Sequence, residues 1–146
     1  MMTWLRPMGR WKSASASSRL TRISSVMVSS AIATVHILYG DGRANRTPEV
    51  RELASIWRWM AEVYPGTPRL TAGDHNLQPT DPAWQPLRDA GAIPSVTAGA
   101  TTLSSHDGEY ANLYDNFWYD PSELNVSGSG IVRYPELLGL SHQQAR

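Results

Sequence analysis

The chain of 146 residues contains no cysteine. This absence excludes a disulfide framework, a metal site built on thiolates and a cysteine nucleophile. No apolar run approaches the roughly 20 residues that a membrane-spanning helix needs, so the sequence predicts no transmembrane span. What remains is a chain of about one domain's length, with 41% hydrophobic residues and a formal net charge of zero, as is typical of a soluble domain.

The distribution of acidic and basic residues divides the chain into two parts. Residues 1–40 hold five basic residues and no acid, whereas residues 41–146 hold eight arginines, no lysine and all thirteen acids. Eight serines fall among residues 1–30, which show no sustained periodicity, so we expect an atypical, poorly ordered Ser/Arg-rich extension. A secretory signal and a basic arm for nucleic acid are the alternatives. Serines interrupt the apolar part of the signal and the basic residues are sparse, which favours a cytoplasmic over a secreted protein.

A strand, a helix and a second strand are predicted from residue 31 onward. Residues 33–40, "ATVHILYG", are rich in β-branched and aliphatic side chains and run into a loop, as a buried strand does. Thr47 is a suitable N-cap and Pro48 a suitable first residue for the helix that follows. Residues 69–76, "RLTAGDHN", are typical of a short strand. This order favours a layered α/β fold in which the helix covers the sheet.

The helix is expected to present one apolar stripe to that sheet. The stripe consists of Val50, Leu53, Ala54, Trp57, Met60 and Ala61. The predicted core between helix and sheet contains Leu38, Val50, Leu53, Trp57, Leu70 and Ala72.

Two further elements are expected in the second half. Residues 80–91, "TDPAWQPLRDAG", predict a short or irregular helix that Asp81 caps and Pro86 interrupts. Residues 111–119, "ANLYDNFWY", predict a strand with Asp115 near its centre. A carboxylate in an aromatic strand needs an explanation, because an unpaired buried charge is costly.

The stretch "LTAGDHNLQP", residues 70–79, has two interpretations. Gly, Asp, Asn and Pro are typical of a turn. Alternatively, Asp74 and Asn76 point to one face of a strand and His75 to the other. Asp74 and Asn76 could then share a phosphate or a metal ion, while His75 is not expected to be a ligand.

Four motifs follow one another in a characteristic order: the histidine of "TVH", "GDHN" followed by "LQPTDPAWQPLRDAG", "TT" with "YANLYDNFWY", and "RYPELLGLSHQQAR". This order resembles the endonuclease/exonuclease/phosphatase superfamily, the relatives of pancreatic deoxyribonuclease. The resemblance implies that residues 31–146 form an α/β domain, a partial two-sheet sandwich. It also implies hydrolysis of phosphate esters with Mg²⁺ or Mn²⁺.

The resemblance also implies roles for four residues. His36 corresponds to the histidine that hydrogen-bonds the scissile phosphate and assists the leaving oxygen. Asp74 corresponds to the aspartate that orients or activates the attacking water, with a tentative part in metal binding. Asn76 corresponds to the amide that holds a phosphate oxygen, and Asp115 to the carboxylate that orients a second histidine.

The sequence departs from the family pattern at both ends. The family's metal-binding glutamate precedes the "TVH" strand, yet residues 1–32 contain no Asn, Asp or Glu. The chain also stops before the family's Ser-Asp-His strand, and His142 is not expected to replace that histidine. We therefore expect an incomplete domain, either a phosphoesterase or a non-catalytic remnant that serves as an interaction module. The substrate, nucleic acid or a small phosphodiester, and the oligomeric state stay open.

Overall fold

The computed structural model describes residues 29–104, 106 and 108–145. The elements are β1 (Ala31–His36), α1 (Arg43–Val63), β2 (Arg69–Asp74), a 3₁₀ turn η1 (Pro82–Trp84), α2 (Gln85–Asp89), β3 (Ile93–Pro94), β4 (Asp115–Tyr119) and α3 (Tyr134–Leu138). The expected extension, residues 1–30, lies outside the described residues except for its last two. No helix in the described part is both long and apolar enough to cross a bilayer.

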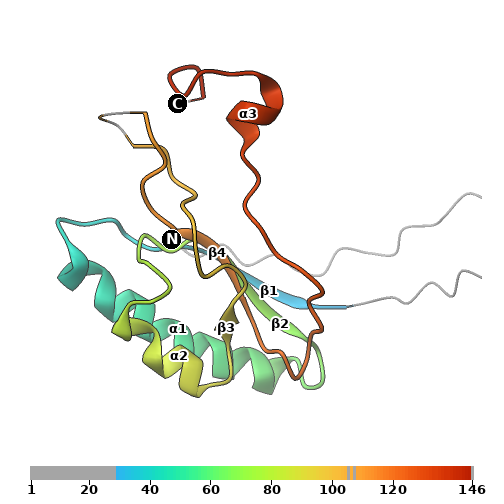
Figure 1. Cartoon of the computed structure of the whole chain (residues 1–146). Helices are drawn as coiled ribbons and strands as arrows, with labels where there is room; N and C mark the ends of the chain where they lie inside the picture. The colour runs from blue at the N-terminus through green and yellow to red at the C-terminus, as the bar shows by residue number, and fades with distance from the viewer. Residues whose placement is uncertain (1–28, 105, 107, 146) are drawn as a thin grey trace, which may run out of the picture.

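The strands form one mixed sheet in the order β1-β2-β4-β3. β1 and β2 are parallel, with α1 as the crossover between them, and β4 runs antiparallel to both β2 and β3. Helices α1 and α2 lie together on one side of the sheet, below it in Figure 1, while the chain after β4 runs up the other side to α3. The predicted α/β class is confirmed, and the described residues supply one helix-covered sheet of the partial sandwich.

The core lies between α1, α2 and the inner face of the sheet. From α1, Val50, Leu53 and Trp57 are fully buried, as predicted. Trp84 stacks on Trp118 of β4 with ring centroids 4.6 Å apart. Because a buried tryptophan removes roughly 150–250 Å² from water, these three rings supply much of the driving force for packing the helices on the sheet.

Three apolar residues predicted in that core lie elsewhere. Leu38 is 65% exposed, and Leu70 and Ala72 are only half-buried on the opposite face of the sheet. Side chains alternate between the two faces of a strand, and α1 covers the face that presents Ala33, Val35 and Thr71 instead. The core prediction was therefore wrong for Leu38, Leu70 and Ala72.

Helix α1 also begins earlier than the sequence indicated. Its first residue is Arg43, with Gly42 as the N-cap, so Pro48 lies inside the helix rather than at its start. The Thr47 hydroxyl donates to the carbonyl of Arg43, 3.0 Å away, instead of capping. By contrast, Asp81 caps η1 as predicted, because its side chain accepts a hydrogen bond from the Ala83 N–H.

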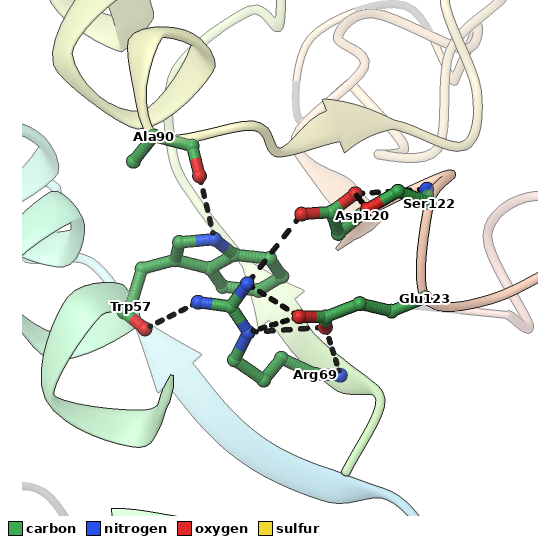
Figure 2. A network of polar contacts seen from close by, with 6 residues as sticks. All are labelled: Trp57, Arg69, Ala90, Asp120, Ser122 and Glu123. Atoms are coloured by element: carbon green, nitrogen blue, oxygen red, sulfur yellow. Dashed lines mark hydrogen bonds and ion pairs between the residues drawn. The ribbon is translucent and has the colours of Figure 1, made fainter. Parts of the chain in front are cut away.

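A buried arginine fixes the end of the sheet where β2 begins (Figure 2). The guanidinium of Arg69 donates to both carboxylate oxygens of Glu123, to Asp120 and to the carbonyl of Trp57. It also lies 4.8 Å from the centre of the Trp57 ring, and the Trp57 indole N–H donates to the Ala90 carbonyl. This Arg69 cluster joins α1, β2 and the turn after β4.

Candidate active site

Three of the four predicted site residues lie side by side at one edge of the sheet. The strand register pairs His36 with Asp74 and Asp74 with Asp115. Paired residues of neighbouring strands point to the same face, and this face is the one opposite α1. The His36 Nε2 atom lies 4.0 Å from Asp74 Oδ2. We call these three residues the site row.

The site row is open to solvent. The His36 side chain is 78% exposed and the Asp74 side chain 31%. Asp115 is also exposed. The Asp74 Oδ1 atom accepts a 2.9 Å hydrogen bond from the Asn76 N–H, which fixes the orientation of the carboxylate. The row can therefore be reached by a substrate.

The stretch "GDHN" is both a turn and the rim of this site. Asn76 has a positive φ of 48°, the left-handed conformation that Asn tolerates in turns. Its Nδ2 donates to the Ile37 carbonyl at 2.7 Å, and only 5% of the residue is exposed. The amide nitrogen carries a second hydrogen. The phosphate-binding role of Asn76 thus stays a prediction, while its contact with the chain after β1 is a fact of the fold.

Gly73 and His75 occupy the helix-facing positions on either side of Asp74. Gly73 has φ +142°, and a Cβ there would lie 2.0 Å from the Val35 carbonyl oxygen, so only glycine fits. His75 is buried edge-on against Trp84, with ring centroids 5.3 Å apart. Burial lowers the pKa of His75, which favours the neutral imidazole. His75 faces away from the site row, in agreement with the sequence analysis.

Asp115 begins β4 beside a threonine that holds this end of the strand. The Thr101 Oγ1 accepts from the N–H groups of Tyr114 and Asp115, at 3.1 and 3.0 Å. Thr101 and Asp115 border a cleft of about 520 Å³ that also touches Phe117 and Ile131. Among the described residues, no ion pair with Asp115 is found.

His142 contacts residues outside the site row. Its Nε2 lies 3.6 Å from Glu136, and its ring packs edge-on against Tyr110.

The chain is similar to proteins of known name and to solved structures. Over 123 residues the chain is 45% identical to a protein named deoxyribonuclease from Thioalkalivibrio sp. (strain K90mix), a match covering 78% of this chain and 34% of that protein. The crystal structure of an endonuclease/exonuclease/phosphatase family protein from Bacteroides thetaiotaomicron matches with a TM-score of 0.50 at 16% identity, covering 62% of this chain and 36% of that one. The described fold is a partial endonuclease/exonuclease/phosphatase fold.

A second solved structure, a mannosyl-6-phosphatase of Bacteroides thetaiotaomicron VPI-5482, gives a TM-score of 0.49 at 16% identity over 62% of this chain and 37% of that one. No model of a known protein family matches the sequence. The chain thus spans about a third of the length of each of these relatives.

Within this partial endonuclease/exonuclease/phosphatase fold, sequence reasoning missed one residue next to the site row. Arg46 of α1 is buried, and its Nε donates to the Tyr39 carbonyl at 2.6 Å. Its Nη1 donates to the Asn76 carbonyl at 2.8 Å and to the Tyr114 hydroxyl at 3.3 Å. A signal was present, because Arg46 lies four residues before Val50, on the inner face of α1.

A divalent cation in this site would need oxygen ligands from the described carboxylates. Among residues 29–104, 106 and 108–145, no group of three His, Asp or Glu side chains is arranged to hold a metal ion. Asp74 and Asp115 nevertheless occupy paired positions on neighbouring strands. Mg²⁺ is often bound through one or two carboxylates, with water and substrate phosphate completing its shell. The two aspartates fit that kind of site.

Proposed function

We propose that this chain carries part of the active site of a divalent-metal-dependent phosphoesterase of the nuclease type. The observation that carries the proposal is the strand register that sets His36, Asp74 and Asp115 in one exposed row. Hydrolysis of a phosphate ester needs a positioned water, neutralisation of the charge on the phosphoryl oxygens and protonation of the leaving oxygen. An imidazole beside two carboxylates has the chemistry for part of each task.

The exposure of each group suggests its role. His36 projects into solvent from the end of β1, so its imidazole can hydrogen-bond a phosphate oxygen and assist the leaving oxygen. Asp74 is held by the Asn76 N–H, which leaves Oδ2 to orient the attacking water. Asn76 has a second amide hydrogen for a phosphate oxygen.

Asp74 and Asp115 would hold the cation. Their hard oxygen donors suit Mg²⁺ or Mn²⁺ better than zinc. When bound, the cation supplies neutralisation of negative charge on the phosphate.

A phosphodiester of DNA is the substrate that the Thioalkalivibrio relative's name supports. The charge of the chain modifies this proposal. Residues 41–146 hold eight arginines against thirteen acids and no lysine, so the electrostatic attraction to a long polyanion is weak. Short nucleic acids and small phosphodiesters are therefore the substrates to examine first.

The proposal is tested by metal binding and by turnover. Mn²⁺ added to isotope-labelled protein should broaden the amide signals of Asp74 and Asp115 before any others. Hydrolysis of bis(p-nitrophenyl) phosphate with Mg²⁺ or Mn²⁺ should be weak and should disappear in Asp74→Asn. Glu62→Gln, which alters an exposed acid of α1, is the matched control and should keep both properties.

Two results would overturn the assignment. The first is Mn²⁺ broadening centred away from the site row. The second is turnover that Asp74→Asn leaves unchanged. A chain that folds and binds phosphate but neither metal nor ester would instead support the alternative of a non-catalytic module.

A further inference from the structure

A polar pocket of about 320 Å³ is lined in part by residues that adjoin the site row along the chain. We infer that this pocket binds a nucleoside unit of the substrate, with the base stacked on Tyr39; the inference rests on the proposed function of the site row. The residues that carry the argument are Tyr39, Asn76, Thr102, Asn112 and Tyr114, which all line the pocket.

Three residues that line the pocket lie in the segments that directly follow or precede the three strands of the site row. Tyr39 follows His36 by three residues, Asn76 follows Asp74 by two, and Tyr114 immediately precedes Asp115. A group covalently attached to a phosphate at the site row would therefore lie next to this pocket.

One buried arginine braces all three walls. Arg46 binds the carbonyls of Tyr39 and Asn76 and the hydroxyl of Tyr114. Removing a guanidinium from water and fixing it to three separate segments is costly unless each donor finds a partner. The hydrogen bonds of Arg46 thus hold the three segments that line the pocket in fixed positions.

The Tyr39 ring is suited to stacking. The Arg46 guanidinium carbon lies 4.1 Å from the ring centroid, so the cation supports one face of the ring. Tyr39 is nevertheless 59% exposed and lines the pocket, so part of the residue stays accessible to a ligand. Stacking of bases on aromatic side chains is a common mode of single-stranded nucleic-acid binding and tolerates any base.

The lining is neutral and able to hydrogen-bond. None of the described residues that line the pocket is acidic, so a phosphate nearby is not repelled. The side chain of Asn112 offers both a donor and an acceptor, as the edge of a base requires. A neutral ring with polar edges and an attached phosphate is therefore the ligand chemistry that matches the lining.

The experiment compares four probes by NMR titration of the whole chain: thymidine, thymidine 5′-phosphate, deoxyribose 5-phosphate and inorganic phosphate. We expect thymidine 5′-phosphate to bind about tenfold more tightly than deoxyribose 5-phosphate, the gain that one stacked base provides. Tyr39→Ala should abolish this difference, and Tyr39→Phe should retain it. Tyr64→Ala, which removes an exposed tyrosine after the far end of α1, should change nothing.

The probes separate this inference from the proposed function. Equal binding of the nucleotide and the sugar phosphate, or an unchanged difference in Tyr39→Ala, would overturn the base pocket. Shifts at Tyr39 and Asn112 with thymidine alone would support the pocket even without phosphate binding. Absence of any phosphate-induced shift at His36 and Asp74 would count against the proposed function and leave the pocket standing.

Discussion

Replacing Arg69 by methionine should destabilise the fold strongly without altering the site. Methionine keeps an apolar stem beneath Trp57 but removes every donor of the Arg69 cluster (Figure 2). Glu123 and Asp120 then lose their cation, with side chains only 29% and 13% exposed. Breaking a buried ion pair from one side costs about 3–5 kcal/mol. Because Glu123 can regain some water, we expect the lower end, about 3 kcal/mol.

Urea unfolding measures this loss. A slope of about 1.5 kcal/mol per molar converts 3 kcal/mol into a midpoint lowered by about 2 M. Arg51→Met, on the exposed face of α1, is the matched control and should stay within about 0.5 kcal/mol of the parent.

The second half of this prediction depends on the distance between the Arg69 cluster and the site row. Arg69 and Asp74 are the first and last residues of β2, and the five residue steps between them span about 16 Å of strand. Phosphate binding measured where Arg69→Met is fully folded should therefore equal that of the parent chain. A loss below about 1 kcal/mol, or weakened phosphate binding by the folded variant, would refute the reasoning.

Two further perturbations test the local geometry. Gly73→Ala should cost more than about 2 kcal/mol in urea unfolding, because its Cβ would overlap the Val35 carbonyl in a strained conformation; Gly128→Ala, with open space around it, is the control. The hydrogen bond from Arg43 lowers the pKa of Asp81. The Asp81 carboxylate therefore stabilises the fold fully above its usual pKa, and this stabilisation is lost as the pH falls through the lowered pKa. Asp81→Asn should therefore lower the unfolding free energy at pH 7 and cease to differ from the parent in strong acid, whereas an equal difference at both pH values would contradict the assignment.

Much of the fold follows from local pattern. The stripe of Val50, Leu53 and Trp57 has helical spacing, and these residues are buried where that spacing places them. Pattern did not reveal which face of the sheet α1 covers. In β2 the apolar residues Leu70 and Ala72 share one face and Arg69 and Thr71 the other, so the pattern favoured the face that α1 does not cover. The earlier start of α1 was also hidden, because a proline is a stronger signal for a helix start than "GRAN" is for a first turn.

The candidate site, too, could be predicted only in part from the sequence. Asp74 and Asn76 stand out in the sequence as polar residues near the end of a strand. The expected shared strand face was wrong, because β2 ends at Asp74 and Asn76 takes a left-handed conformation in which it is buried. The cluster around Arg69 could not be anticipated, since Glu123 lies 54 residues away and no local rule connects them. Arg46 was hidden for a related reason. Its partners are two backbone carbonyls and a phenol, none of which leaves a charge pattern in the sequence.

The pairing of β2 with β4 links the chemistry of the site to the choice of core residues. A strand presents alternate residues to opposite faces, so sliding β4 by one position would turn Asp115 toward α1 and bring Trp118 out into solvent. Trp118 is 1% exposed and stacks on Trp84, so such a slip would forfeit the burial of a large ring. The packing of Trp118 on Trp84 therefore fixes the strand register that places the Asp115 carboxylate in the site row. We expect changes to Trp118 to misplace Asp115 even though the two side chains lie on opposite faces of the sheet.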